Sequence, residues 1–380
     1  MYLAQLGASV IRVDQIGGGP DFRRWPVGDS GASFFWEGMN KGKKSIAIDL
    51  TKLAGRELLE QLATAPGENA GLLLTNLPVD GFLAHQKLAK LRSDLITIRI
   101  MGRANGDPAV DYTMNCEVGV PYLTGPAALG DLPVNHVLPA WDLLTGAYAS
   151  FALLAALRHR DLTKEGQEVR IPLTDIAIST IANFGQFGEV IHTGTNRARY
   201  GNELFGAFGR DFLTKDRERI MIVAITRGQW VGLMKSLGIE AEVADIETAR
   251  GADFTRNEGD RFIHREPLFE LVASHISRCP KSDLAEAFKR HHVCWGSYRS
   301  TLQAMQDPEL VTQNPIFTSI LHPSGLTYPA PGAPASLPSF ERQDPIAAPR
   351  LGAHTEEILF DVLQLSSPDI RRLYDDGVVS

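Results

Sequence analysis

Apolar and polar positions follow two alternating periods along the first half of the chain. Short apolar runs typical of buried strands are separated by stretches in which apolar residues recur at every third or fourth position, as on one face of a helix. The strands are expected at 9–14, 44–50, 70–77, 95–102 and 166–173, and the helices at 54–65, 83–93 and from residue 142 onward. This alternation predicts an α/β fold with a Rossmann-like parallel sheet and helical crossovers.

The chain opens in the middle of this pattern. Residues 2–7, YLAQLG, are typical of a last helical turn that ends at a glycine, and the strand at 9–14 follows at once. In a doubly wound sheet, the first strand and the turn after it help to form the ligand crevice. We therefore expect either a fold that begins late, or a strand and most of a helix before Met1.

The pattern changes after residue 205. The segment DFLTKDRERIMIVAI at 211–225 predicts a hairpin. Residues 322–349 hold seven prolines, too many for a helix or a central strand and typical of an extended linker. Charged amphipathic helices are expected near 229–237, 266–277 and 282–290.

These changes divide the chain into four parts. The tail after the prolines is helical again, because HTEEILFDVLQL and SSPDIRRLYDDG each begin with polar residues that suit a helix N-terminus. We expect a large Rossmann-like domain at 1–195, a small α+β domain at 205–315, a proline-rich linker at 316–350 and C-terminal helices at 351–380 that return to the large domain.

Composition and charge exclude several classes of function. Hydrophobic residues make up 44% of the 380 positions and charged residues 22%, which is typical of a folded protein. The net charge of -7 gives no reason to expect nucleic acid or an anionic membrane as a partner, and no apolar run is expected to span a membrane. The three cysteines form no C-x-x-C pair, so we expect no disulfides and a cytoplasmic location.

Asp142 is the first candidate for chemistry. It lies after Pro139, at the start of the apolar stretch WDLLTGAYASFALLAALRHR, where a helix is expected to begin. One interpretation is an N-cap or first-turn aspartate that satisfies free backbone N–H groups, the commoner fate of such residues. The other is a nucleophile, because an ionised carboxylate can attack an activated acyl group without a general base.

A basic turn at 40–44, NKGKK, precedes the second predicted strand. Its lysines, Lys41, Lys43 and Lys44, either form a solvated turn, the usual outcome for a charge run, or bind phosphate. Phosphate binding would also engage Asn40.

Three further motifs carry weaker signals. QIGGGPD at 15–21 lacks the G-x-G-x-x-G spacing of a dinucleotide site, so we expect a flexible loop there and no nicotinamide-dependent dehydrogenase. HHVCWG at 291–296 is expected to be a strand whose adjacent histidines point to opposite faces, which argues against a metal site. The segment at 200–212 carries Gly206 and Gly209 and forms either a turn or a flap that closes over an intermediate.

The motifs together resemble the class III CoA-transferases, the formyl-CoA transferase and carnitine-CoA transferase family. The resemblance runs nearly from end to end, and the order and spacing of its segments carry it. These segments are LAQLGASVIRVD, NKGKKSIAIDL, LLLTNLP, VDYTMN, PAWDLLTG, GQEVRIPLTDIA and the closing APRLGAHTEEILFDVLQL.

The resemblance implies an enzyme and assigns its nucleophile. In this family, the aspartate of the pattern matched here by DLLTG attacks an acyl-CoA thioester and becomes an aspartyl-CoA thioester, so the role falls on Asp142. Asn76 matches a position that lines the CoA cleft, and Lys43, Lys44 and Asn40 fall near its nucleotide end. CoA enters as part of the substrate, and neither a metal nor a permanently bound cofactor is implied.

The resemblance also implies partners and a substrate class. Segments such as GGGPDFRRWP and VNHVLPAWDLLTG are similar to members that move CoA between two carboxyl groups of one dicarboxylic acid. Arg23, Arg24 and His136 are then candidates for binding the remote carboxylate, because arginine binds carboxylates in a bidentate way. Family members are interlocked homodimers, so the resemblance implies a second copy of the chain as a partner. The sequence departs from the family at Gln15, where a basic residue is common.

Two alternatives remain open at this point. The first is intermolecular transfer in the same family, with succinyl-CoA or a similar donor. The second is a non-catalytic acyl-CoA binding protein, which would hold CoA without forming an adduct on Asp142.

Overall fold

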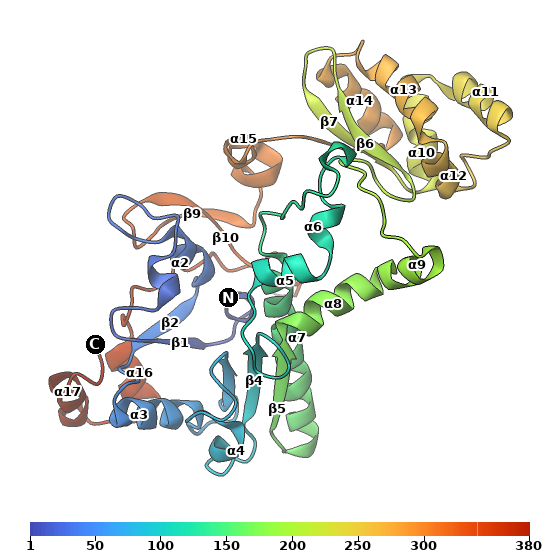
Figure 1. The fold of residues 1–380 in the computed structure, drawn as a ribbon. Helices are drawn as coiled ribbons and strands as arrows, with labels where there is room; N and C mark the ends of the chain where they lie inside the picture. The colour runs from blue at the N-terminus through green and yellow to red at the C-terminus, as the bar shows by residue number, and fades with distance from the viewer. Residues whose placement is uncertain (340) are drawn as a thin grey trace. The chain divides into compact units, whose positions relative to one another are not determined.

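The computed structural model describes residues 1–339 and 341–380, which form two compact units (Figure 1). Unit 1 comprises Met1–Met114, Leu138–Phe184 and Met305–Ser380, and unit 2 comprises Asn115–Val137 and Gly185–Ala304. The segment Asn115–Val137 therefore groups with unit 2, although the sequence pattern placed it in the large domain. The predicted domain limits stay predictions.

Two parallel sheets form the framework of unit 1. The first pairs β1 (Val10–Asp14) with β2 (Lys43–Ala47), and the second has the order β3 (Leu72–Thr75), β4 (Ile96–Met101), β5 (Gln167–Pro172). All five predicted strands are therefore present, each within a few residues of its expected limits. The predicted α/β class with parallel sheets is confirmed.

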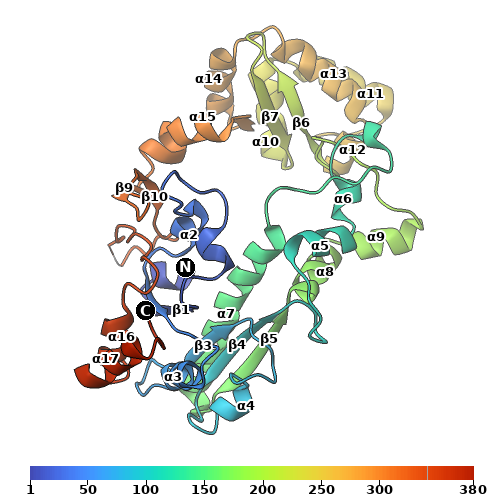
Figure 2. The same cartoon turned by 60° about the vertical axis from the view of Figure 1, so that its left-hand side comes forward.

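Helix α7 (Ala140–Thr163) packs against β4 and β5, as both ribbon views show (Figures 1 and 2). Ala149, Ala152 and Ala156 are buried in the cluster that includes Ile96 and Ile98 of β4. Small side chains on this face let the helix axis come close to the sheet, which explains the alanine-rich sequence. By length and composition α7 could also cross a membrane, but its buried alanines cover a sheet, as in a core helix.

The other sheet of unit 1 is covered from both chain halves. α3 (Leu53–Ala63), α16 (Thr355–Asp361) and α17 (Ser367–Asp375) contribute to one apolar cluster with Ile46 and Ile48. All three helices were predicted. Other elements of unit 1 are α1 (Tyr2–Gln5), η1 (Pro20–Arg23), α2 (Phe34–Met39), α4 (His85–Leu88), α8 (Leu173–Asn183) and the π-helical turn η3 (Pro308–Thr312). The division between the two units falls within α5 (Asp111–Glu117).

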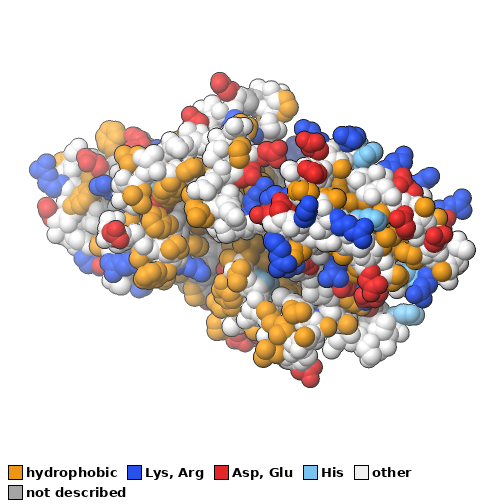
Figure 3. Space-filling model, turned by 90° about the horizontal axis from the view of Figure 1, so that it is seen from above, with side chains coloured by type: hydrophobic (Ala, Val, Ile, Leu, Met, Phe, Trp, Pro, Cys, Tyr) orange, Lys and Arg blue, Asp and Glu red, His pale blue; other side chains and the backbone are white. Residues whose placement is uncertain are grey.

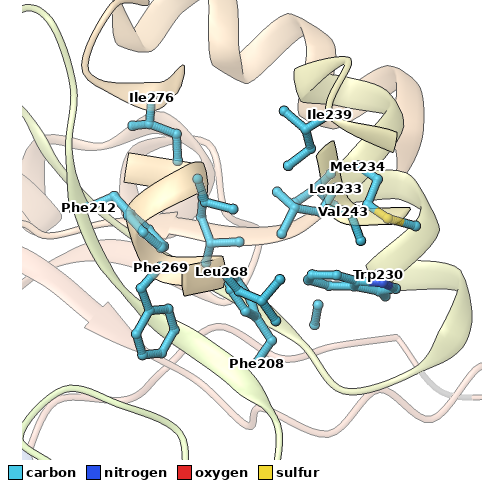
Figure 4. Packing of buried hydrophobic residues seen from close by; sticks show 14 of the residues in the cluster. Phe208, Phe212, Trp230, Leu233, Met234, Ile239, Val243, Leu268, Phe269 and Ile276 are labelled. Atoms are coloured by element: carbon cyan, nitrogen blue, oxygen red, sulfur yellow. The ribbon is translucent and has the colours of Figure 1, made fainter. Parts of the chain in front are cut away.

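Unit 2 is built on an antiparallel sheet. β6 (Phe208–Leu213) and β7 (Arg219–Ala224) form the predicted hairpin, and β8 (Cys294–Ser297) pairs with β7. Aromatic and aliphatic side chains from the sheet and its helices fill one core around Phe208 and Trp230 (Figure 4). The three predicted helices are α10 (Arg227–Leu237), α13 (Arg265–Ile276) and α14 (Lys281–His291).

Gly232 lets two of these helices approach closely. A Cβ atom at this position of α10 would lie 2.2 Å from the carbonyl oxygen of His291 at the end of α14, so any larger residue would separate the helices. The remaining elements of unit 2 are α6 (Val120–Leu123), η2 (Ala127–Leu129), α9 (Gln186–Thr193), α11 (Glu240–Arg250) and α12 (Glu258–Ile263). Unit 2 ends at Ala304, within α15 (Thr301–Gln306).

Two predicted elements are wrong in part. His291 ends α14 and His292 follows in the left-handed region at φ 56°, so these histidines lie at a helix end and the strand begins only at Cys294. The helix expected at 83–93 is only α4, because Leu88 is buried whereas Leu91 is 63% exposed and gives no reason to continue the helix.

Part of the proline-rich segment forms a hairpin, and the described residues between that hairpin and residue 350 form no helix, as predicted. β9 (Phe317–Leu321) pairs with β10 (Thr327–Pro331) in a sheet of two strands. Both strands are edges, so Pro329 and Pro331 cost no ladder hydrogen bond on the outer side of β10.

A buried carboxylate joins this hairpin to α2. Glu37 is 1% exposed and accepts hydrogen bonds from the Ser324 backbone N–H at 2.6 Å and from the Tyr328 hydroxyl at 2.7 Å. Burial, and then the hydrogen bond to Glu37, raises the pKa of Tyr328, which therefore stays a donor. The His322 ring stacks on Tyr328 with centroids 3.6 Å apart. These contacts fix α2, which ends beside Asn40.

We expect the Tyr328→Phe substitution to lower the free energy of unfolding by about 2 kcal/mol, because it removes one hydrogen bond to a buried charge. Urea unfolding measures the change. Tyr122→Phe is the matched control, since Tyr122 is 53% exposed and its hydroxyl makes no hydrogen bond among the described residues. Equal midpoints for the two variants would contradict a stabilising role for this contact.

Candidate active site

Asp142 lies in the first turn of α7. The helix begins at Ala140, Pro139 occupies the N-cap position, and no side chain of that residue caps the helix. Among the described residues, no hydrogen bond or ion pair engages the Asp142 carboxylate. The carboxylate is therefore left available for a reaction.

The side chain that caps α7 comes from a distant segment. Asp111 at the start of α5 is 2% exposed, and its Oδ2 accepts hydrogen bonds from the backbone N–H groups of Trp141 at 2.7 Å and of Asp142 at 3.1 Å. The N-cap interpretation of Asp142 is therefore wrong, because Asp111 already takes the free N–H groups that a cap would satisfy.

The surroundings of Asp142 make its carboxylate more basic. Burial raises the pKa of Asp142, the negative charge of Asp111 raises it further, and the positive charge of Arg24 opposes both. The residue as a whole is exposed to solvent, so the surrounding protein removes only part of the hydration of the carboxylate. A carboxylate of raised pKa and reduced hydration is a stronger nucleophile than a fully solvated aspartate.

The predicted carboxylate-binding residues lie in different places. Arg24 is within electrostatic range of Asp142, and its guanidinium lies 4.5 Å from the centre of the Phe35 ring. Arg23 turns toward the loop, where its Nη2 donates to the Gly17 carbonyl oxygen at 3.4 Å. His136 belongs to unit 2, whereas Asp142 belongs to unit 1.

The basic turn forms a connected network. Asn40 Oδ1 accepts hydrogen bonds from Lys43 Nζ at 2.8 Å and from Arg12 Nη1 at 3.2 Å, and Arg12 Nε donates to Asp14 Oδ2 at 2.8 Å. Burial, and then the charge of Arg12, lower the pKa of Lys43 to about 8. A solvated turn is therefore the wrong description of Lys43, and also of Lys41, which is 4% exposed.

Lys44 differs from its neighbours, since it is exposed to a greater extent and its Nζ lies 2.5 Å from Glu357 Oε1 of α16. Arg12 was missed from the sequence, although an arginine inside the short strand VIRVD is itself a signal that a charged partner lies nearby.

Asn76 directly follows β3 and is exposed. It therefore lies at the carboxyl end of a parallel strand, the edge at which α/β sheets bind ligands. Within the described residues, no hydrogen bond joins Asn76 to the lysine network.

The glycines of the predicted flap have distinct surroundings. Gly206 adopts φ +82° in a turn, and a Cβ atom added there would have no other atom within 4 Å. Gly209 lies inside β6, where an added Cβ atom would be 2.9 Å from Leu204 Cβ. Close packing thus explains Gly209, and a flap role for either glycine stays a prediction.

The surface carries both signs of charge. On the face drawn in Figure 3, lysine and arginine side chains are intermixed with aspartate and glutamate.

Within residues 1–339 and 341–380, no group of three or more His, Cys, Asp or Glu side chains is placed to hold a metal ion.

Comparison with known proteins defines the family. A family model described as CoA-transferase family III matches residues 1–355. The chain is 46% identical to a 2-methylfumaryl-CoA isomerase from Chloroflexus aurantiacus, over all of this chain and 93% of that protein. It is 24% identical to a succinate–glutarate CoA-transferase from Agrobacterium fabrum, over 95% of this chain and 90% of that protein.

A solved structure supports the same fold. A CaiB/BaiF family protein from Brucella suis superposes with a TM-score of 0.73 at 23% identity, covering 95% of this chain and 93% of that one. The protein belongs to CoA-transferase family III. The family and the enzyme class predicted from the motifs are confirmed.

We expect Asp111→Asn to move the acid limb of the pH–rate profile to lower pH. The asparagine oxygen can still accept the two backbone N–H groups, but the negative charge that raises the pKa of Asp142 is gone, so Asp142 stays ionised at lower pH. The measurement is kcat/KM for CoA transfer against pH.

Asp111→Ala separates charge from capping, because it removes both and should also lower the free energy of unfolding by about 1 kcal/mol. An acid limb that stays in place or moves to higher pH in Asp111→Asn would contradict the electrostatic coupling of the two carboxylates.

Proposed function

We propose that the protein is a 2-methylfumaryl-CoA isomerase, which moves CoA from the C1 to the C4 carboxyl group of mesaconyl-CoA with Asp142 as the nucleophile. The observation that carries this proposal is the unengaged carboxylate of Asp142, set in the first turn of α7 while Asp111 caps the helix. The identity of 46% to a protein of that name supports the choice of substrate.

The reaction proceeds by exchange at acyl carbon atoms. An Asp142 carboxylate oxygen attacks the C1 thioester carbon, the C–S bond breaks, and a mixed anhydride and the CoA thiolate form. The thiolate then attacks Asp142 Cγ, which releases the C1 carboxylate and leaves an aspartyl-CoA thioester. Splitting the transfer in this way replaces one difficult step by several easier ones.

The second half repeats these steps at the other end of the acid. The C4 carboxylate attacks Asp142 Cγ and expels the thiolate, and the thiolate attacks the C4 carbonyl carbon of the new anhydride. Asp142 leaves as a free carboxylate. Charges and electrons balance at every step, so the transfer requires neither a redox group nor a permanently bound cofactor.

Intramolecular transfer depends on keeping the free acid in the site. A retained dicarboxylate presents its second carboxylate to Asp142 at a high effective concentration. Arg24 is the best supported partner for the remote carboxylate, because its charge already acts on Asp142. Arg23 and His136 are proposed for the same carboxylate, and Gly206 and Gly209 for a closing flap.

The CoA moiety is assigned to the basic network. Lys43, which donates to Asn40 beside Arg12, would bind a phosphate group. The negative charge of the phosphate would raise the pKa of this lysine again. Lys44 and Asn76 are proposed for neighbouring parts of CoA.

Intermolecular transfer with a donor such as succinyl-CoA is the alternative within the family, and the name of the Agrobacterium relative favours it. A non-catalytic acyl-CoA binding protein is the alternative outside catalysis. It would require Asp142 to stay unmodified, although its carboxylate is activated by its surroundings.

We expect the purified protein to convert mesaconyl-C1-CoA to the C4 isomer without incorporating isotope-labelled free mesaconate, because the acid never leaves the site. Chromatography with mass detection follows both products. Labelled C4 product would establish the intermolecular alternative, and absence of product would contradict the proposed substrate.

Asp142→Asn provides the control for this experiment. It should reduce the rate by a factor of about 10⁴ or more, since an amide cannot form the anhydride, while the unfolding midpoint stays close to that of the unaltered protein. A variant that retains turnover would contradict the role of Asp142.

We further propose a homodimer located in the cytoplasm. α7 carries three exposed apolar residues at helical spacing, namely Leu144, Tyr148 and Phe151. Phe151 is 67% exposed. A second copy of the chain would cover this stripe, as the family resemblance implies. The three cysteines are free, which suits a reducing compartment.

We expect Phe151→Glu to increase the monomer fraction, because it places a charge in an interface that excludes water. Light scattering during size-exclusion chromatography measures the mass over a range of concentrations. Leu91→Glu, at an apolar position that is 63% exposed and lies outside α7, is the control. A monomeric unaltered protein, or a dimer unaffected by Phe151→Glu, would contradict this interface.

A further inference from the structure

Unit 2 contains a cavity that the proposed reaction does not use. It has a volume of about 320 Å³ and lies among the end of α10, the connection from α13 to α14, and the first turns of α14. This volume is at the small end of the range of about 300–1,000 Å³ found for ligand sites.

The cavity has an apolar side. Leu237 of α10 and Leu284 and Ala287 of α14 line it, and Leu284 is 3% exposed. Leu237 and Leu284 also belong to the core of unit 2, so this wall is fixed by the packing behind it. It suits a short aliphatic group rather than a hydrated ion.

The cavity also has two opposite charges that do not pair with each other. Arg278 and Asp283 both line it and are exposed to solvent, and neither makes an ion pair within the described part of the chain, although Asp283 Oδ1 accepts a hydrogen bond from the Ser282 hydroxyl at 3.0 Å. His275 adds a ring nitrogen, Nδ1, that is buried and has no hydrogen-bond partner there. An apolar wall with a few convergent polar groups at its rim is the usual composition of a small-molecule site.

The segment that carries Arg278 is held in place. The carbonyl oxygen of Cys279 accepts a hydrogen bond from the Lys215 N–H at 3.0 Å, and the Lys281 N–H donates to Asp216 Oδ1 at 3.1 Å. Both partners lie in the turn between β6 and β7. The charged groups are therefore presented from a backbone that is anchored beside Arg278.

We propose that this cavity binds a small zwitterion with an aliphatic side chain, of the chemistry of a free apolar amino acid. Arg278 receives the carboxylate, Asp283 receives the ammonium group, and the aliphatic group lies against Leu237, Leu284 and Ala287. A simple carboxylate would place a second negative charge near Asp283, and a simple amine would place a second positive charge near Arg278.

Cys279 offers a direct reporter, because it lines the cavity and is a free, partly buried thiol. We expect leucine at saturating concentration to slow alkylation of Cys279 in the full-length protein by about tenfold, as mapped by peptide mass spectrometry. Cys294 is free and exposed in the same unit, and its alkylation rate should not change.

Two analogues of leucine test the charge assignment. 4-Methylpentanoate lacks the ammonium group and 3-methylbutan-1-amine lacks the carboxylate, so each should bind about tenfold more weakly or worse. Equal protection by either analogue would overturn the zwitterion, and equal slowing at Cys279 and Cys294 would show a global effect instead of a site.

Variants test the same site without relying on the thiol. Arg278→Gln and Asp283→Asn should each weaken leucine binding about tenfold in isothermal titration calorimetry, and Ala287→Leu should abolish it by filling the cavity. Arg290→Gln, on an exposed position of α14, is the control. No measurable heat with the unaltered protein, or equal affinity in Arg278→Gln and Arg290→Gln, would overturn the proposal.

Discussion

The acceptance of two backbone N–H groups by Asp111 is the interaction on which the candidate site depends. The Asp111 carboxylate satisfies the N–H groups of Trp141 and Asp142 at 2.7 and 3.1 Å, and a helix N-terminus attracts negative charge. Because that position is filled from another segment, the carboxylate of Asp142 need not cap its own helix. One buried charge thus holds α7 and leaves a second carboxylate free to react.

The same arrangement sets the chemistry of Asp142. An aspartate that capped the helix would be stabilised as an anion and would be a weak nucleophile. Here burial and the neighbouring charge of Asp111 raise the pKa of Asp142, so the carboxylate gains basicity while α7 stays anchored on β4 and β5. One contact between segments therefore caps the helix and adds to the activation of the side chain, while packing on the sheet anchors α7.

Local periodicity was sufficient for the framework and insufficient for the site. The strands around Ile98 and the alanine-rich face of α7 follow from patterns within a few residues, so they could be predicted. The Asp111 cap joins residues 30 positions apart, and no local pattern encodes such a contact. Arg12 and the helical position of His291 were missed for a related reason, because burial and helix length are decided by tertiary packing.

The most direct test of this account is peptide mass spectrometry after brief incubation of the protein with mesaconyl-C1-CoA. We expect a CoA adduct on the peptide that contains Asp142, sensitive to hydroxylamine and absent in Asp142→Asn. An adduct on another carboxylate, or turnover in single-turnover experiments without any protein-bound CoA, would contradict covalent catalysis by Asp142.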